Sequence, residues 1–186
     1  MKKVYLIHGW EGSYTQGHGW FDDLRKKLPE KGYELDGFDM PNTDTPVIEE
    51  WVGFMKEKIK DLDEDTYLIG HSIGAQAILR YLETLPEGKK IKGCVFVAGW
   101  FNLKGLEEEP ESIEIVEPWI KTPIDFEKVK SHCDNFLVIL SDNDPWVPIE
   151  SKELFEKKLG AKVIILQNKE HFNEVSEIPE ILEFIK

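Results

Sequence analysis

Cysteine is scarce in this sequence, and long apolar runs are missing. Cys94 and Cys133 are the only cysteines among 186 residues, which is too few for a disulfide framework. Cys94 lies within the apolar run 94–97 and is expected to be a small buried hydrophobic side chain, so we do not expect a disulfide between the two. No stretch reaches the ~20 apolar residues that are needed to cross a bilayer.

Basic residues are also fewer than acidic ones. The chain has 23 lysines and arginines against 36 aspartates and glutamates, which gives a formal net charge of −13. Such a field repels phosphate, so we expect neither nucleic acid nor an anionic membrane as a partner. The N-terminal apolar run 4–7 is shorter than the ~7–15 residues of a signal-peptide core. We therefore expect a soluble, cytoplasmic protein that acts on a small molecule, and the sequence leaves its oligomeric state open.

Two hydrophobic patterns alternate along the chain. Short β-branched-rich runs, typical of strands buried on both faces, occur at residues 4–7, 67–69, 94–98, 136–140 and 163–166, with a weaker one at 33–38. Between them, apolar residues recur with helical spacing. The alternation predicts the α/β class, a three-layer α/β/α arrangement with a mainly parallel sheet of about six strands, in a single domain. In such sheets the functional site lies at the carboxyl ends of the strands.

A G-x-S-x-G pentapeptide, Gly70-His71-Ser72-Ile73-Gly74, follows one of these strands and precedes a helix. This placement is typical of a nucleophile elbow, in which a sharp turn exposes the serine hydroxyl at the top of the sheet. The glycines leave room for the close backbone packing of that turn. The sequence therefore predicts that Ser72 is a nucleophile, in preference to a residue of an ordinary glycine-rich turn.

A serine hydroxyl needs a neighbouring base, and chain order narrows the choice. In this fold the triad follows the order serine, acid, histidine. Only His132 and His171 come after Ser72, and only His171 follows a strand, so His171 is the predicted base. The acid should follow the preceding strand, where Asp142 and Asp144 both stand, and spacing does not separate them.

Backbone donors and aromatic walls complete the predicted site. The N–H groups of Trp10, in the loop after the first strand, and of Ile73, at the start of the helix after Ser72, are the expected oxyanion donors. An apolar substrate pocket is expected from the aromatic residues in loops at the same end of the sheet, namely Trp10, Trp100, Phe101 and Trp146. The segment from Leu103 to Lys121 stands where this fold often carries a cap, and it is a candidate lid.

Several of these motifs together resemble the family of small serine hydrolases related to retinoblastoma-binding protein nine and YdeN. The resemblance rests on His8-Gly9, the pentapeptide at 70–74, residues 141–148 and His171-Phe172, with further similarity over 118–133. It implies one compact α/β-hydrolase domain over residues 1–186, without a large cap, and a Ser-His-Asp triad whose acid is Asp144. The Leu-x-Cys-x-Glu partner motif of the family's namesake is missing, because no leucine stands two residues before either cysteine.

The sequence thus predicts a carboxylesterase-like serine hydrolase that uses an acyl-enzyme intermediate and neither metal nor cofactor. Thioester, amide and lactone substrates stay open beside esters. One alternative is a binding protein on a hydrolase scaffold, since fold alone does not fix function. A metal hydrolase built on His8, His18 or His71 is the other alternative, although these histidines lack the helical spacing of paired ligands. Otherwise His8 and His71, each beside a turn glycine, are expected to have packing or supporting roles.

Overall fold

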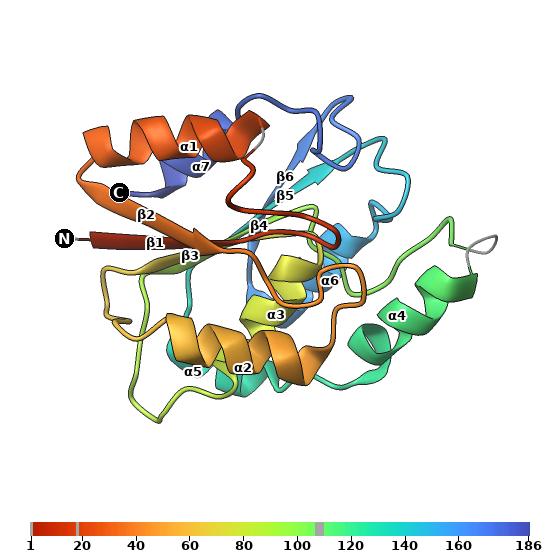
Figure 1. Cartoon of the computed structure of the whole chain (residues 1–186), viewed down its shortest axis with the longest axis horizontal. Helices are drawn as coiled ribbons and strands as arrows, with labels where there is room; N and C mark the ends of the chain where they lie inside the picture. The colour runs from red at the N-terminus through yellow and green to blue at the C-terminus, as the bar shows by residue number, and fades with distance from the viewer. Residues whose placement is uncertain (1, 18, 107–109) are drawn as a thin grey trace.

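The computed structural model describes residues 2–17, 19–106 and 110–186. In these residues six strands form a single sheet, ordered β2-β1-β3-β4-β5-β6, with every neighbouring pair parallel (Figure 1). The strands are β1 (Lys2–Ile7), β2 (Tyr33–Phe38), β3 (Tyr67–His71), β4 (Gly93–Val97), β5 (Phe136–Ser141) and β6 (Lys162–Leu166). The predicted α/β class and the parallel sheet of about six strands are confirmed.

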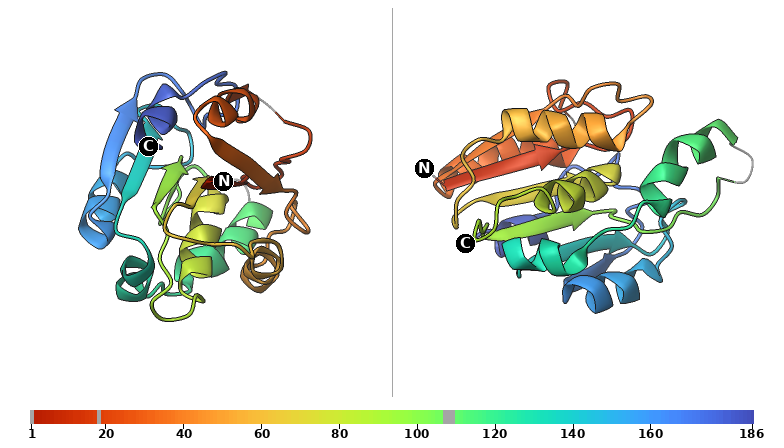
Figure 2. Two further views of the ribbon diagram at one scale, coloured as in Figure 1. Left: turned by 90° about the vertical axis from the view of Figure 1, so that its left-hand side faces the viewer. Right: turned by 90° about the horizontal axis from the view of Figure 1, so that it is seen from below.

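The helices form a layer on each face of the sheet (Figure 1 and Figure 2). One face is covered by α1 (Gly19–Glu30) and α7 (Pro179–Phe184), and the other by α2 (Ile48–Lys58), α3 (Ile73–Leu82), α5 (Phe126–His132) and α6 (Ser151–Leu159). Helix α4 (Pro110–Lys121) lies outside both layers, beyond the carboxyl ends of the strands. No helix of the described ranges is both long and apolar enough to cross a membrane.

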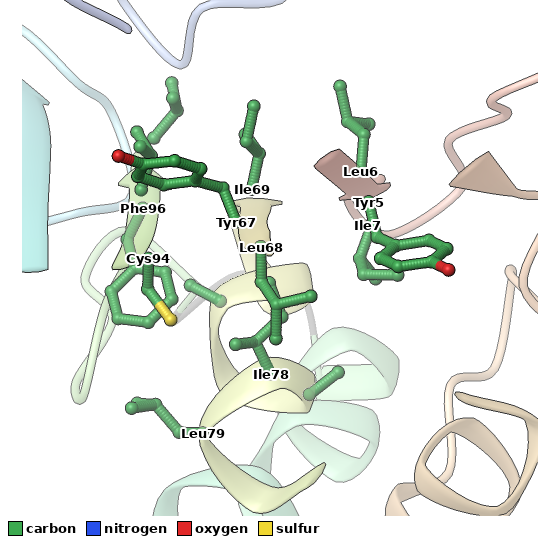
Figure 3. Close-up of a cluster of buried hydrophobic side chains, with 14 of the residues drawn as sticks. Tyr5, Leu6, Ile7, Tyr67, Leu68, Ile69, Ile78, Leu79, Cys94 and Phe96 are labelled. Carbon is green, nitrogen blue, oxygen red and sulfur yellow. The ribbon is translucent and has the colours of Figure 1, made fainter. Parts of the chain in front are cut away.

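The apolar runs of the two central strands, β3 and β4, show no alternation of apolar and polar residues, because both faces of these strands are covered. Successive side chains of a strand point to opposite faces of the sheet, and in β3 Leu68 points toward α3 while Ile69 points the other way (Figure 3). Because helices cover both faces, every residue of β3 and β4 is buried. In the edge strand β2 Tyr33 is buried and the other positions are exposed or partly buried, which accounts for its weaker signal in the sequence.

The two cysteines pack in this core. Cys94 points from β4 toward α3 (Figure 3), and Cys133 lies next to its thiol. Both are buried and free. Burial raises the pKa of the Cys94 thiol well above its usual value, and the neighbouring Cys133 thiol raises it further. Cys94 therefore stays a neutral, inert side chain in the folded protein.

Candidate active site

Ser72 lies in a strained turn between β3 and α3. Its φ of 52° and ψ of −120° are seldom adopted by residues other than glycine. Its backbone N–H donates to the carbonyl oxygen of Val97 at 2.8 Å, which ties the turn to β4. Both flanking glycines are sterically required, because a Cβ on Gly70 would lie 2.6 Å from the backbone of α3 and one on Gly74 would lie 2.4 Å from the carbonyl oxygen of Ile7. This turn has the shape of a nucleophile elbow.

His171 and Asp144 form a buried pair. Nδ1 of His171 lies 2.8 Å from Oδ2 of Asp144, and the two residues are 8% and 2% exposed. The other carboxylate oxygen of Asp144 accepts the backbone N–H groups of Trp146 at 2.9 Å and Val147 at 3.0 Å. An ionised carboxylate only accepts, so Nδ1 of His171 carries the hydrogen and Nε2 is left with a basic lone pair.

The geometry distinguishes the two aspartates that spacing could not. Oδ1 of Asp142 accepts the backbone N–H of Asn168 at 2.8 Å, so Asp142 holds the loop after β6. Asp144, in contrast, accepts the hydrogen bond that the imidazole ring of His171 donates. The two carboxylates, although two positions apart, therefore have different tasks.

Short polar side chains at the end of β5 hold the loop that carries His171. Oγ of Ser141 accepts the backbone N–H of Lys169 at 3.0 Å, and Oδ1 of Asn143 accepts the backbone N–H of Glu170 at 2.9 Å. Sequence reasoning did not assign these contacts. The signal was present, since Ser, Asp and Asn side chains readily bond to backbone groups and Ser141 and Asn143 stand beside the predicted acid.

The same loop is strained. Asn168, Glu170 and Phe172 have φ angles of 54°, 47° and 64°, in the left-handed region that residues other than glycine seldom adopt. Such backbone persists only where surrounding contacts determine it. The carbonyl oxygen of His171 accepts a further bond from Nε2 of His71 at 2.8 Å, so the predicted base is held from both sides.

Ser72 and His171 line one cavity of about 320 Å³. Trp10 and Ile73, the expected oxyanion donors, line the same cavity. Because Ile73 is the first residue of α3, its N–H has no acceptor within the helix. Trp10 is held by its indole N–H, which donates to the backbone carbonyl of Asp44 at 2.8 Å.

Three of the four aromatic residues expected in the pocket line this cavity. Trp10, Trp100 and Trp146 do so, and the ring of Trp146 meets that of His171 at a centroid distance of 4.9 Å and an angle of 85°. The expectation is wrong for Phe101, which is not among the lining residues. The centroid of its ring lies 4.4 Å from that of Phe155 in α6, because the loop after β4 turns it toward the helix layer.

The candidate lid contributes part of the wall. Among the described residues, four of the candidate lid line the cavity, and so does one in the loop that follows His171. The sequence did not single out these five as lining residues: Leu103, Leu106, Ser112, Val116 and Asn173. Residues 107–109 of the candidate lid lie outside the described residues, as does His18 of the metal alternative.

His8 is engaged with backbone on both sides of its ring. Its Nε2 accepts the N–H of Met40 at 2.8 Å, and its Nδ1 donates to the carbonyl oxygen of Gly9 at 2.7 Å. This places His8 in the support of the loop after β1, which includes the lining residue Trp10. Within the described ranges, no group of three or more His, Cys, Asp or Glu side chains could hold a metal ion.

Comparison with known proteins adds independent information. A family model described as serine hydrolase matches residues 4–182. YdeN of Bacillus subtilis is 32% identical over 173 residues, which cover 93% of this chain and 87% of YdeN. Serine hydrolase RBBP9 of Rattus norvegicus is 29% identical over 185 residues, which cover 99% of this chain and 94% of RBBP9.

Solved structures show the same architecture. The crystal structure of the ydeN gene product from B. subtilis matches with a TM-score of 0.87 at 29% identity, over 98% of this chain and 96% of that one. A carboxylesterase structure from Nitrososphaera gargenis matches with a TM-score of 0.73 at 13% identity, over 98% of this chain and 88% of that one. At that identity the second match bears on the fold alone.

Proposed function

The chain belongs to the serine hydrolase family, and from that premise we propose that it cleaves esters or related acyl bonds with the triad Ser72, His171 and Asp144. Family and fold support a hydrolase of the α/β-hydrolase kind. One observation carries the finer proposal. The 2.8 Å hydrogen bond from Nδ1 of His171 to Asp144 leaves the basic Nε2 on a ring that lines the same cavity as the strained Ser72.

In the proposed first step, the Ser72 oxygen attacks the carbonyl carbon of the substrate while Nε2 of His171 takes the hydroxyl proton. The carbonyl π electrons move onto its oxygen, where the N–H groups of Trp10 and Ile73 stabilise the negative charge. The intermediate then collapses: the carbonyl double bond re-forms, and the bond between the carbonyl carbon and the alcohol oxygen breaks. The leaving alcohol takes the proton from His171, and the acyl group stays on Ser72.

In the second step, water attacks the acyl-enzyme in the same way. His171 takes a proton from the water, and the tetrahedral intermediate releases a carboxylic acid as the proton returns to the oxygen of Ser72. Asp144 orients the imidazole ring and stabilises the imidazolium that forms in each step. Trp146 packs edge-on against that ring and limits its rotation.

Labelling with a fluorophosphonate tests this proposal, together with a panel of simple esters. We expect wild type to take up one phosphonyl group at Ser72 and to cleave esters, whereas Ser72→Ala should take up none. His171→Ala should lose most turnover, with only the contribution of binding and oxyanion contacts left. Wild type that neither reacts nor cleaves any ester would contradict the proposal and favour the binding protein. Turnover that a chelator abolishes would favour the metal hydrolase.

A further inference from the structure

The apolar face of helix α4 is only partly covered by the body of the protein. Val116 and Trp119 are buried, whereas Ile113 and Ile120, which lie on the same face because they are three and four residues from Val116, remain 40% and 38% exposed. A surface helix of a globular protein normally turns its apolar face to the core. The exposed side of this face is therefore a place where a ligand or partner would gain by contact.

An open groove of about 320 Å³ runs along this exposed side. Its lining is mainly aliphatic and comes from Leu103, Leu106, Ile113, Val116 and Ile120. The surface that this groove presents to a ligand is therefore mainly hydrocarbon.

The charged residues of the groove do not favour a polar ligand. Glu117 and Lys121 are bonded to each other along the helix, which leaves Lys104 as the other charged residue of the lining among the residues that the structure describes. The net charge of −13 works against an acidic ligand. A neutral, apolar occupant fits this lining best.

The groove adjoins the cavity of Ser72. Leu103, Leu106 and Val116 line both spaces, so the two share a wall. The cavity itself is near the lower end of the ~300–1,000 Å³ that small-molecule sites span. A ligand that extends beyond it on this side passes over the shared wall and reaches the groove.

We propose that the groove binds the far end of an unbranched alkyl chain whose ester carbonyl lies at Ser72. This inference rests on the proposed function, and it names the substrate class as esters with a chain longer than butyl. Each methylene moved out of water raises kcat/KM by up to about fourfold. The chain belongs to either the acyl group or the alcohol, since both have the same chemistry.

Two ester series distinguish these sources. The first varies the acyl group of p-nitrophenyl esters from acetate through butyrate and octanoate to laurate. The second varies the alcohol of acetate esters from ethanol through butanol and octanol to dodecanol. We expect wild-type kcat/KM to rise with chain length in the series whose chain occupies the groove.

Substitutions on α4 test the groove itself. The double variant Ile113→Gln/Ile120→Gln replaces the two exposed groove residues, and Ile115→Gln is the matched control because Ile115 is on the same helix and lines neither space. We expect the double variant to lower the ratio of long-chain to short-chain kcat/KM by about tenfold. The control should keep the wild-type ratio.

Each outcome bears on a separate claim. An unchanged ratio in the double variant, with Ser72-dependent cleavage of short esters, would overturn the groove and leave the proposed function standing. Wild type that cleaves no ester and takes up no fluorophosphonate would overturn both. If the double variant fails to fold, the single variants Ile113→Gln and Ile120→Gln are judged by the same ratio.

Discussion

Nε2 of His71 lies 2.8 Å from the carbonyl oxygen of His171. Because a carbonyl only accepts, Nε2 of His71 carries the hydrogen and donates it. The residue before the proposed nucleophile therefore holds the backbone of the proposed base. The His71 ring is 4% exposed and packs edge-on against Trp20 at a centroid distance of 5.8 Å, so the donor is fixed in place.

We predict that His71→Phe lowers kcat by about tenfold or more with little change in KM, because the backbone of His171 loses a donor that sets its position. His71→Gln places an amide N–H near the position of Nε2 and should recover most of the lost rate. Steady-state kinetics with one ester checks both variants. Equal rates for Phe and Gln would show that the ring matters only as packing.

Substitution of the two neighbouring aspartates should have very different effects. We predict that Asp144→Asn lowers kcat by a factor on the order of 10⁴, because the amide no longer favours the required tautomer of the His171 ring or its charged form. Asp142→Asn keeps an oxygen that accepts the N–H of Asn168 and should lower kcat less than about tenfold. Similar losses in the two variants would contradict the assignment of Asp144 as the acid.

The sheet was predictable because burial leaves a mark on sequence composition. Strands β3 and β4 are covered on both faces, so apolar and small residues predominate in them, and the motif at Ser72 could be placed at a strand end. The composition of a loop carries no comparable signal of which side chains are buried. Trp100 lines the cavity whereas its neighbour Phe101 packs on Phe155, and the difference depends on loop dihedral angles that hydrophobic patterns do not encode.

The same limit applies to the loop around His171. Three of its residues have positive φ angles, although none of them is a glycine. The backbone of this loop is held by Asp142, Ser141 and Asn143 across the end of the sheet, through the N–H groups of residues 168–170. These contacts join segments that are 26 to 28 residues apart, so the sequence shows side chains able to bond to backbone groups but not which backbone groups they meet.

Two glycines should respond in opposite ways to substitution by alanine. A Cβ at Gly74 would lie 2.4 Å from the carbonyl oxygen of Ile7, whereas one at Gly53 in α2 would meet nothing within 4 Å. We predict that Gly53→Ala stabilises the protein by about 0.5–1 kcal/mol, because glycine is unfavourable inside a helix. Gly74→Ala should destabilise it, because the elbow must move. Urea unfolding measures both, and a stabilising Gly74→Ala would contradict the packing described for the elbow.

Asp39, at the carboxyl end of β2, gives the fold a specific acid sensitivity. Its Oδ1 accepts the hydroxyl of Ser13 at 2.8 Å and the backbone N–H groups of Tyr14 at 2.6 Å and Thr15 at 3.0 Å. Partial burial alone would raise the pKa of Asp39, but a bond from the hydroxyl of Thr15 to Oδ2, together with these three bonds, outweighs it and lowers that pKa from 3.8 to about 2. The ionised carboxylate therefore stabilises residues 13–15, in the loop after β1 that also carries Trp10.

We predict that this stabilisation is complete above pH 3.8 and is lost as the pH falls toward 2, because a depressed pKa means that the unfolded chain takes up the proton first. Asp39→Asn removes the titrating group, so its free energy of unfolding should fall less steeply between these two values than that of wild type. Urea unfolding at a series of pH values measures the slopes. Asp36→Asn, the same substitution at a position within β2, is the matched control. If Asp39→Asn keeps the slope of wild type, the loop is held by something other than the charge of Asp39.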